Sequence, residues 1–293
     1  MLIPLGWLFE PASDAWRKAA TTRGFYYIAH WAWYEWLGVL APLALLFAFQ
    51  RILRPTQPSD ASRPALIPLV SSLLYYGVFQ SVVGVAIMLP PSLERLRPLE
   101  PMRYLHLLYL LFFLLLGALL GQYALRRHVY RWALLFVPLC AGLLYAQLQM
   151  YPASAHVEWP GSTPKNEWLQ AFDWIRLNTP VDARFALDPH YMQLPGEDYH
   201  GFRALAERSV LADYDKDGGM AARVPSLAPR WLKEVSAENG WRDFQPQDLE
   251  RLKNEFGVNW IVLSRADKLF SRAPSAPMTC PYENQQVRVC RLY

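Results

Sequence analysis

The sequence predicts a multi-pass α-helical membrane region with four spanning helices, followed by a small α/β sandwich domain. Two observations lead to this fold class. Residues 24–150 are strongly apolar and aromatic, and they contain four long segments with almost no charged side chains. Residues 151–293 carry most of the acidic residues and mix both signs of charge, as a water-soluble domain does. The two halves therefore require different surroundings.

Four segments are long enough to cross a bilayer. A spanning helix needs about 20 largely apolar residues, because the hydrocarbon core is about 30 Å thick and a helix rises about 1.5 Å per residue. The segments are about 31–49, 66–89, 105–125 and 132–150. Trp and Tyr gather at their ends, where an apolar ring and a polar tip both find a suitable environment. The partner indicated by these segments is the lipid bilayer.

Flanking basic residues predict the orientation. The connections on the two sides of the membrane carry equal numbers of Lys and Arg, so the total does not decide. Arg126, Arg127 and Arg131 surround the third connection, whereas no Lys or Arg follows the fourth segment before Lys165. Because positive loops stay in the cytoplasm, we expect the second half of the chain outside. The predicted location is a bacterial inner membrane, with a periplasmic or extracellular domain.

Composition divides the chain into four regions. Residues 1–30 form an external segment, and its apolar start at Met1–Phe9 is too short to span a bilayer and lacks a signal-peptide pattern. This start resembles the tail of a helix, so we expect the chain to be the back half of a longer protein or the product of a split gene. Residues 31–150 form the membrane region, 151–163 a Pro-rich linker and 164–293 the α/β domain.

The second half alternates helical and strand patterns. A helix is expected to begin at Pro164 and to end near Asn178, with Trp168, Phe172 and Ile175 on one face. Further helices are expected at 200–207, 229–239 and 246–256, strands at 184–188, 209–213 and 258–263, and a terminal hairpin at 277–293. Such alternation predicts a partly parallel sheet.

Polar side chains gather where predicted strands and helices end. The candidate site residues in this half are Asp188, His190, His200, Arg203, Arg208, Asp213 and Lys216. Ligands of open α/β sheets bind beyond the carboxyl ends of the strands, which makes this set a candidate polar site. The alternative is solvated loop charge with an Arg–Asp ion pair that stabilises the domain.

A short acidic run resembles the first half of a calcium loop. Asp213, Asp215 and Asp217 occupy alternate positions, and Gly218 follows them. The position that should supply the last glutamate ligand is Val224, and Lys216 places a positive charge inside the loop. An acidic turn after a strand explains the same residues, so the sequence assigns no metal and no cofactor.

The three cysteines fall into two groups. Cys280 and Cys290 are spaced for a short hairpin closed by a disulfide, which fits an oxidising compartment. The alternative is two free thiols on neighbouring strands. Cys140 lies inside an apolar segment and is expected to be a packing residue.

Glu35 is the only acidic residue within the four apolar segments. An ionisable group in a membrane span is costly and is therefore a candidate functional residue. Its position near the end of the segment allows a structural role equally well, such as pairing with an arginine of a neighbouring loop.

Several motifs together resemble the C-terminal part of bacterial membrane proteins of the GT-C glycosyltransferase type. They are Gly24–Gly38, Glu100–His106, Gly117–Gly121, Trp174–Pro180, Phe202-Arg203, Glu207–Ser209 and Lys216. The resemblance covers nearly the whole chain, and the terminal domain resembles those of unknown function. It implies a polyprenyl-phosphate-linked sugar as partner. The family's catalytic acid would precede residue 1, so no catalytic residue is carried over.

The sequence therefore favours the C-terminal membrane and extracytoplasmic portion of a GT-C-like protein that is not catalytic alone. The alternative is a membrane-anchored binding or scaffold module without enzymatic activity. A transporter fragment fits less well, because the spans lack paired charges and repeats. A small net charge of +4 without a Lys/Arg run excludes a nucleic-acid footprint.

Overall fold

A computed structural model of the chain describes residues 12–53, 63–152, 166–194, 201–271 and 278–293. The apolar start, most of the predicted linker, Pro164 and His200 lie outside these described residues. The chain forms two compact units, residues 1–136 and 137–293. Composition alone places the boundary at residue 150, whereas the structural division falls inside the fourth long helix.

Four helices are long and apolar enough to cross a membrane, as the sequence predicts. They are α2 (Trp33–Ile52), α3 (Arg63–Met88, apolar from Leu66), a continuous Pro101–Leu125 helix and α5 (Val129–Met150). The third consists of a 3-10 turn (Pro101–Tyr104), α4 (Leu105–Leu119) and a π-helical turn (Leu120–Leu125). A short helix, α1 (Asp14–Thr21), precedes them.

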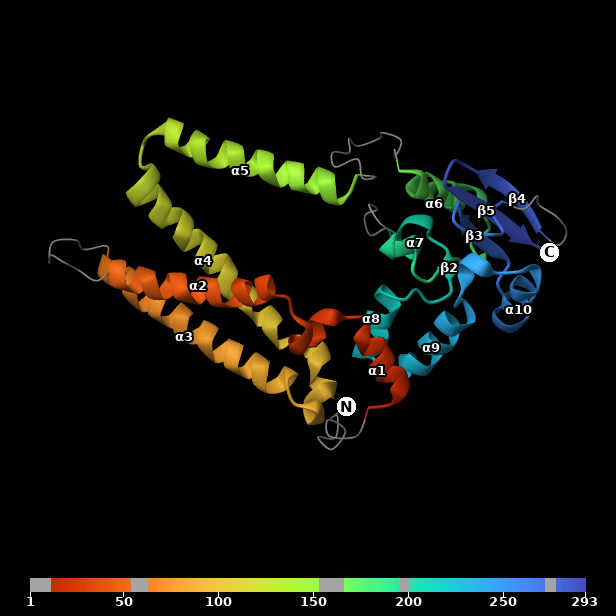
Figure 1. Ribbon diagram of the computed structural model, residues 1–293, viewed down its shortest axis with the longest axis horizontal. Coiled ribbons are helices and arrows are strands. Elements are labelled where there is room, and N and C mark those ends of the chain that lie inside the picture. Colours follow the sequence, from red (N-terminus) through yellow and green to blue (C-terminus); the bar gives the residue numbers. More distant parts are fainter. Residues whose placement is uncertain (1–11, 54–62, 153–165, 195–200, 272–277) are drawn as a thin grey trace. The chain divides into compact units, whose positions relative to one another are not determined.

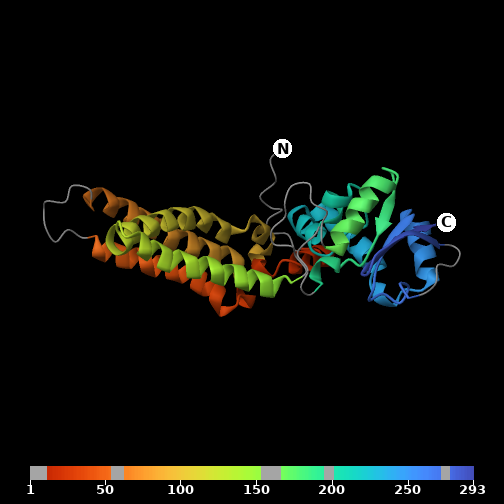
Figure 2. The same ribbon diagram turned by 90° about the horizontal axis from the view of Figure 1, so that it is seen from above.

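The first three long helices pack against one another, with α2 and α3 side by side (Figures 1 and 2). Leu108, Phe112 and Leu115 of α4 repeat every three or four residues and therefore lie on one buried face. Phe112 stacks on Phe49 of α2 with ring centroids 6.1 Å apart. Gly77 of α3 allows the close approach, because a Cβ there would lie 2.3 Å from Leu108 Cδ1.

The second unit contains a five-stranded mixed sheet with the order β2-β1-β3-β5-β4. Its strands are β1 (Arg184–Ala186), β2 (Ser209–Val210), β3 (Trp260–Ser264), β4 (Met278–Glu283) and β5 (Val287–Leu292). β1 runs parallel to both β2 and β3, whereas β5 is antiparallel to β3 and β4. The prediction of a partly parallel sheet is confirmed.

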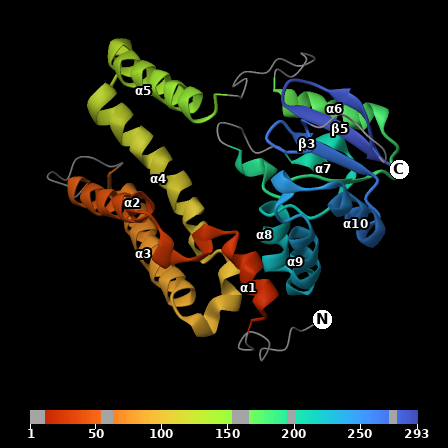
Figure 3. The same ribbon diagram turned by 45° about the vertical axis from the view of Figure 1, so that its right-hand side comes forward.

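Helices cover both faces of this sheet. Trp260 and Val262 of β3 pack with α6 (Glu167–Asn178) and α7 (Phe202–Ala206). The alternate residues Ile261 and Leu263 pack with α10 (Pro246–Phe256). Figure 3 shows α6 and α10 on opposite sides of the strands. This two-sided burial follows from the period of two along a strand.

The helix ends in this unit follow local sequence rules. α9 (Ala228–Ala237) is followed by Gly240 with φ 77°, and α10 by Gly257 with φ 67°. Both glycines adopt the left-handed conformation that L side chains avoid. α6 begins after Asn166, whose side chain accepts hydrogen bonds from the amides of Trp168 and Leu169.

The bounds of one predicted strand near the site were wrong. The strand expected at 209–213 is shorter, because only Ser209 and Val210 stay in the sheet as β2. The following residues turn away, and Asp213 caps α8 (Lys216–Arg223) through the amides of Lys216 and Asp217. Two glycines, which have a poor helix propensity, lie buried inside α8.

Candidate functional site

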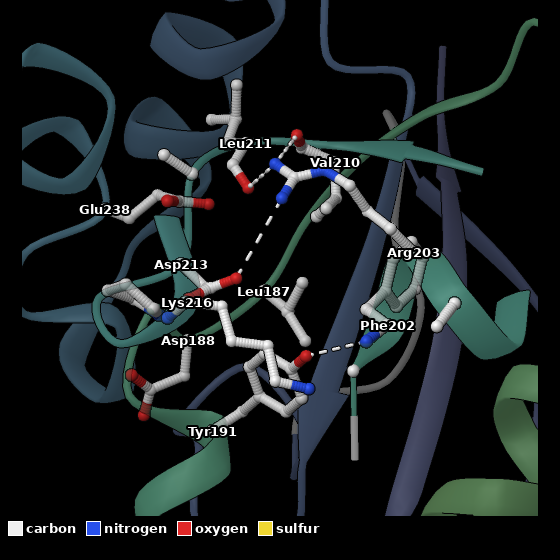
Figure 4. A pocket seen from close by; sticks show the side chains of 14 residues that line it. Leu187, Asp188, Tyr191, Phe202, Arg203, Val210, Leu211, Asp213, Lys216 and Glu238 are labelled. Atoms are coloured by element: carbon white, nitrogen blue, oxygen red, sulfur yellow. Dashed lines mark hydrogen bonds and ion pairs between the residues drawn. The ribbon is translucent and has the colours of Figure 1, made fainter. Parts of the chain in front are cut away.

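A cavity of about 150 Å³ lies at the carboxyl ends of β1 and β2 (Figure 4). This volume holds about five water molecules at liquid density. Its polar lining side chains are Asp188, Tyr191, Arg203, Asp213, Lys216 and Glu238. Leu187, Phe202, Val210 and Leu211 supply most of its apolar wall.

Strand direction explains why these residues meet. Leu187 and Asp188 directly follow β1, and Leu211 to Asp213 follow β2. Because β1 and β2 are parallel, both segments leave the sheet at the same edge. That edge is where open α/β sheets place their ligands. Four of the residues predicted for a polar site, Asp188, Arg203, Asp213 and Lys216, therefore line one cavity.

Arg203 ties the wall of the cavity together. Its guanidinium donates hydrogen bonds to the Asp217 carboxylate at 2.6 and 2.7 Å. It also donates to the carbonyl oxygens of Val210 at 2.9 Å and Leu211 at 3.2 Å. Asp213 lies 3.9 Å from the same guanidinium. The Arg–Asp ion pair considered as the alternative thus exists, and it forms part of the cavity.

Asp213 combines a structural contact with an unusual protonation equilibrium. Its Oδ1 accepts hydrogen bonds from the amides of Lys216 at 2.6 Å and Asp217 at 3.2 Å. Burial and the nearby Asp217 charge raise the pKa of Asp213 to about 6, against the opposing effect of those amides and of Arg203. The carboxyl therefore changes charge close to neutral pH.

Glu238 is the most deeply buried acid of the cavity, with 1% of its surface exposed. It follows the last turn of α9, and its carboxyl is labelled in Figure 4 facing the cavity. Both of its carboxyl oxygens are buried without a hydrogen-bond partner among the described residues. Burial, and after it the charges of Glu234, Asp188 and Asp213, raise the pKa of Glu238 well above its ordinary value.

Tyr191 and Lys216 complete the polar lining. The Tyr191 hydroxyl accepts a hydrogen bond from the Phe202 amide at 2.7 Å, and burial raises the Tyr191 pKa. Lys216 is exposed, and its ammonium lies close to the Gly201 backbone. The cavity thus carries a neutral phenol, two cationic groups and three carboxyls against an apolar wall.

His190 and Arg208 do not line this cavity. His190 is exposed, and its ring lies 4.4 Å from the Tyr214 ring. Arg208 is buried and donates to the carbonyl oxygens of Arg176 and Thr179, both at 2.7 Å. Arg208 therefore holds the end of α6, which is a structural role that its sequence context does not reveal.

Glu35 lies in the other unit and caps its own helix. Its Oε2 accepts a hydrogen bond from the Ala32 amide, just before α2, at 2.7 Å. Glu35 also lines a separate cavity of about 360 Å³ with Tyr26, Glu100 and His106. The structure thus gives Glu35 a local structural contact that does not involve an arginine.

The carboxylates of the acidic run 213–217 make local hydrogen bonds and an ion pair. Asp213 and Asp217 exchange hydrogen bonds with each other's backbone amides, and Asp217 also pairs with Arg203. Asp215 instead accepts a hydrogen bond from Gln193. In the part of the chain that the structure describes, no group of three His, Cys, Asp or Glu side chains could hold a metal ion.

Cys280 of β4 and Cys290 of β5 form a disulfide, with their Cα atoms 3.9 Å apart. Cys290 is fully buried against the α10 side of the sheet. Cys140, by contrast, is a free and exposed cysteine on α5, so it does not pack inside the unit as expected.

The sequence analysis missed Glu238 and Tyr191. Glu238 had a signal: an acid at the carboxyl end of a helix opposes the helix dipole, and Glu234 repels it four residues earlier. Two such unfavourable placements on one face indicate a role other than helix stability. Tyr191 carries no comparable signal, because a buried tyrosine is ordinary in a protein core.

Comparisons with known proteins cover part of this unit. Residues 166–225 match a family model described as a domain of unknown function (DUF6798). No curated protein and no solved structure matches the chain. The matched segment includes Asp188, Arg203, Asp213 and Lys216 of the cavity, whereas Glu238 lies beyond it. Over residues 166–225 the chain is therefore similar to a domain whose function is unknown.

Proposed function

We propose that this chain is the C-terminal membrane and extracytoplasmic portion of a GT-C-like glycosyltransferase-type protein, and that it binds rather than transfers. In this proposal the α/β unit holds a small hydroxyl-rich ligand, such as a sugar ring, at the edge of its sheet. The cavity at the carboxyl ends of β1 and β2 carries the proposal. The sequence resemblance and the four apolar helices support its membrane context.

The chemistry of the cavity suits a sugar. Each hydroxyl group donates one hydrogen bond and accepts others, so a sugar needs acceptors and donors close together. Asp213 and Glu238 offer carboxyl oxygens, while Lys216 offers an ammonium. Phe202 and Leu187 provide apolar surface for the C–H groups of a ring. The volume of about 150 Å³ suits one ring rather than a long glycan.

A titration of the full chain in lipid nanodiscs tests this binding role. D-Glucose, D-galactose and D-mannose serve as probes, with isothermal titration calorimetry as the measurement. We expect saturable binding of at least one hexose, weakened about tenfold by Lys216→Ala through loss of a charged hydrogen bond. Lys253→Ala on α10 is the matched control and should bind as the parent does. Absence of saturable binding by all three probes would overturn the proposal.

A transfer assay tests the proposal that this chain does not transfer a sugar by itself. The full chain in proteoliposomes is incubated with a polyprenyl-phosphate-linked sugar and a soluble glycan acceptor. We expect no transfer from this chain by itself, because the resemblance carries no catalytic residue over onto this sequence. Transfer by this chain alone would show that it carries its own catalytic residues, and the binding-only assignment would then be wrong.

A further inference from the structure

We infer that the cavity at the edge of the sheet selects a ligand carrying a primary ammonium group beside its hydroxyls, and that Glu238 and Asp213 receive this ammonium. The inference rests on the proposed binding function and narrows its ligand class. It starts from the surplus of carboxyl groups that face the cavity.

Most charges around the cavity are already paired. Arg203 lies 2.6 Å from Asp217, so its charge is largely committed there. Glu234, behind the wall, pairs with Arg230 at 2.9 Å and with Arg184 at 3.7 Å. It also accepts a hydrogen bond from the Ala212 amide. These contacts remove Asp217 and Glu234 from the acids available to a ligand.

Three carboxyl groups and one ammonium group of the lining remain available to a ligand. Asp188, Asp213 and Glu238 line the cavity, whereas Lys216 is the exposed cation at its wall. Arg203 approaches Asp213 only at 3.9 Å. If all three carboxyls ionise, the cavity holds more negative than positive charge, and a cationic ligand would balance it.

Glu238 gives the strongest indication of a missing partner. It is 1% exposed, lines the cavity and has no hydrogen-bond partner at either carboxyl oxygen among the described residues. A buried carboxyl without adequate partners is unfavourable and indicates a role for the group. The raised pKa values of Glu238 and Asp213 agree: burial is the main cause for both, and neighbouring carboxylates add to it, Asp217 for Asp213 and Glu234, Asp188 and Asp213 for Glu238. A bound cation would offset these unfavourable effects.

Aromatic groups of the wall fit the same ligand. Tyr191 and Phe202 both line the cavity. The negative face of an aromatic ring attracts an ammonium group, which neutral hydroxyls do not exploit. The cavity therefore has both carboxyl groups and aromatic side chains in its lining.

The experiment compares three sugars of one ring size on the full chain in lipid nanodiscs. D-Glucosamine carries the ammonium, D-glucose lacks it, and N-acetyl-D-glucosamine has the nitrogen without the charge. Calorimetry is done at about pH 6, where an amine of this kind remains protonated. We expect glucosamine to bind at least about tenfold more tightly than glucose, and N-acetylglucosamine to show no such gain.

Two variants assign the preference to the carboxyls. Glu238→Gln should reduce the ratio of glucosamine affinity to glucose affinity to about one, whatever its effect on glucose binding itself, and Asp213→Asn, which keeps a capping side chain, should reduce that ratio. Glu250→Gln, at an exposed position of α10, is the matched control and should retain it. Thermal unfolding of each variant verifies that it is folded.

Proton release gives an independent readout. A bound ammonium lowers the pKa of both carboxyls, so glucosamine should release protons and glucose should not. Titrations in two buffers of different ionisation enthalpy measure this release. Equal affinity for glucose and glucosamine, without proton release, would overturn the inference and leave the proposed binding function standing. Failure of both sugars to bind would overturn the proposed function itself.

Discussion

Two buried acids near the same edge of the sheet differ in how they are satisfied. Asp267, 2% exposed, follows β3 and accepts hydrogen bonds from the Ser264 amide at 2.7 Å and from Trp241 Nε1 at 3.2 Å. Glu238, 1% exposed, has no hydrogen-bond partner at either carboxyl oxygen among the described residues. Asp267 therefore stabilises a turn, whereas Glu238 reduces stability unless a ligand reaches it. Burial alone does not separate the two roles, but the partners do.

The difference in stability between Glu238→Gln and the parent should grow as pH rises. The unfolded chain releases the Glu238 proton near pH 4.5, but the folded chain retains it to a higher pH because its pKa is raised. The folded state thus binds more protons in this window, so stability falls as pH rises through it. The variant lacks this loss, and its melting temperature should exceed that of the parent increasingly above pH 4.5.

Circular dichroism melts from acidic to neutral pH measure this difference. Asp267→Asn is the contrasting variant: it loses the charge-assisted hydrogen bond from the Ser264 amide and should melt lower than the parent at neutral pH. A Glu238→Gln variant that melts lower than the parent at neutral pH would contradict the assignment of Glu238.

Arg208 should be a stability residue. Arg208→Met keeps the length of the side chain but removes its donors to the carbonyls of Arg176 and Thr179. Buried carbonyls left without donors should lower the free energy of unfolding by about 2–4 kcal/mol. Chemical denaturation measures the change, and Arg242→Met, at an exposed position, should stay within about 0.5 kcal/mol of the parent. If Arg208→Met lost glucose binding without losing stability, the structural role of Arg208 would be contradicted.

At the scale of elements, patterns with a local cause could be predicted. α10 and its stop at Gly257 follow from an apolar face and a left-handed glycine. The end of β2 could not be predicted, because Val210 and Leu211 are equally apolar and only the Asp213 cap decides where the strand stops. The cavity was predicted in part, since strand ends locate Asp188 and Asp213, whereas Glu238 arrives from a distant helix.

The hairpin of β4 and β5 should depend on its disulfide. A double Cys280→Ala and Cys290→Ala variant opens a short closed loop, whose entropic effect on the unfolded chain is about 3 kcal/mol. Its melting temperature should therefore fall, and a reductant should lower the parent's but not the variant's. Cys140→Ala is the control and should leave both unchanged, because Cys140 is free and exposed. Identical melting of parent and double variant would contradict this role.

At the scale of the whole molecule, the chain joins an apolar helical unit to a unit with a charged surface and an internal sheet. The four helices are compatible with a multi-pass membrane protein. The sidedness is our proposal, and it rests on the arginines of the third connection and on the compartment that a disulfide favours. Composition is sufficient to predict the four apolar helices, whereas the predicted sidedness depends on a few charged residues.

Cysteine labelling in intact cells tests the sidedness. In a Cys140→Ala background, a membrane-impermeant maleimide should label Glu250→Cys on α10 and should not label Arg127→Cys in the third connection. Permeabilised cells should show labelling at both positions, since both residues are exposed. The reverse pattern in intact cells would place the α/β unit in the cytoplasm.

The exposed apolar surface of α5 has a consequence for the substitutions that this helix tolerates. None of its residues is buried, although it is 22 residues long and strongly apolar. If hydrocarbon chains are its neighbours, they impose no shape on its side chains, in contrast to the interlocking rings of Phe49 and Phe112. Leucine, valine, isoleucine and phenylalanine should then exchange in α5 almost without penalty. For α5 the apolar composition matters more than the identity of each residue. A saturation-mutagenesis map should therefore show that apolar substitutions are tolerated in α5 and are destabilising along the buried face of α4.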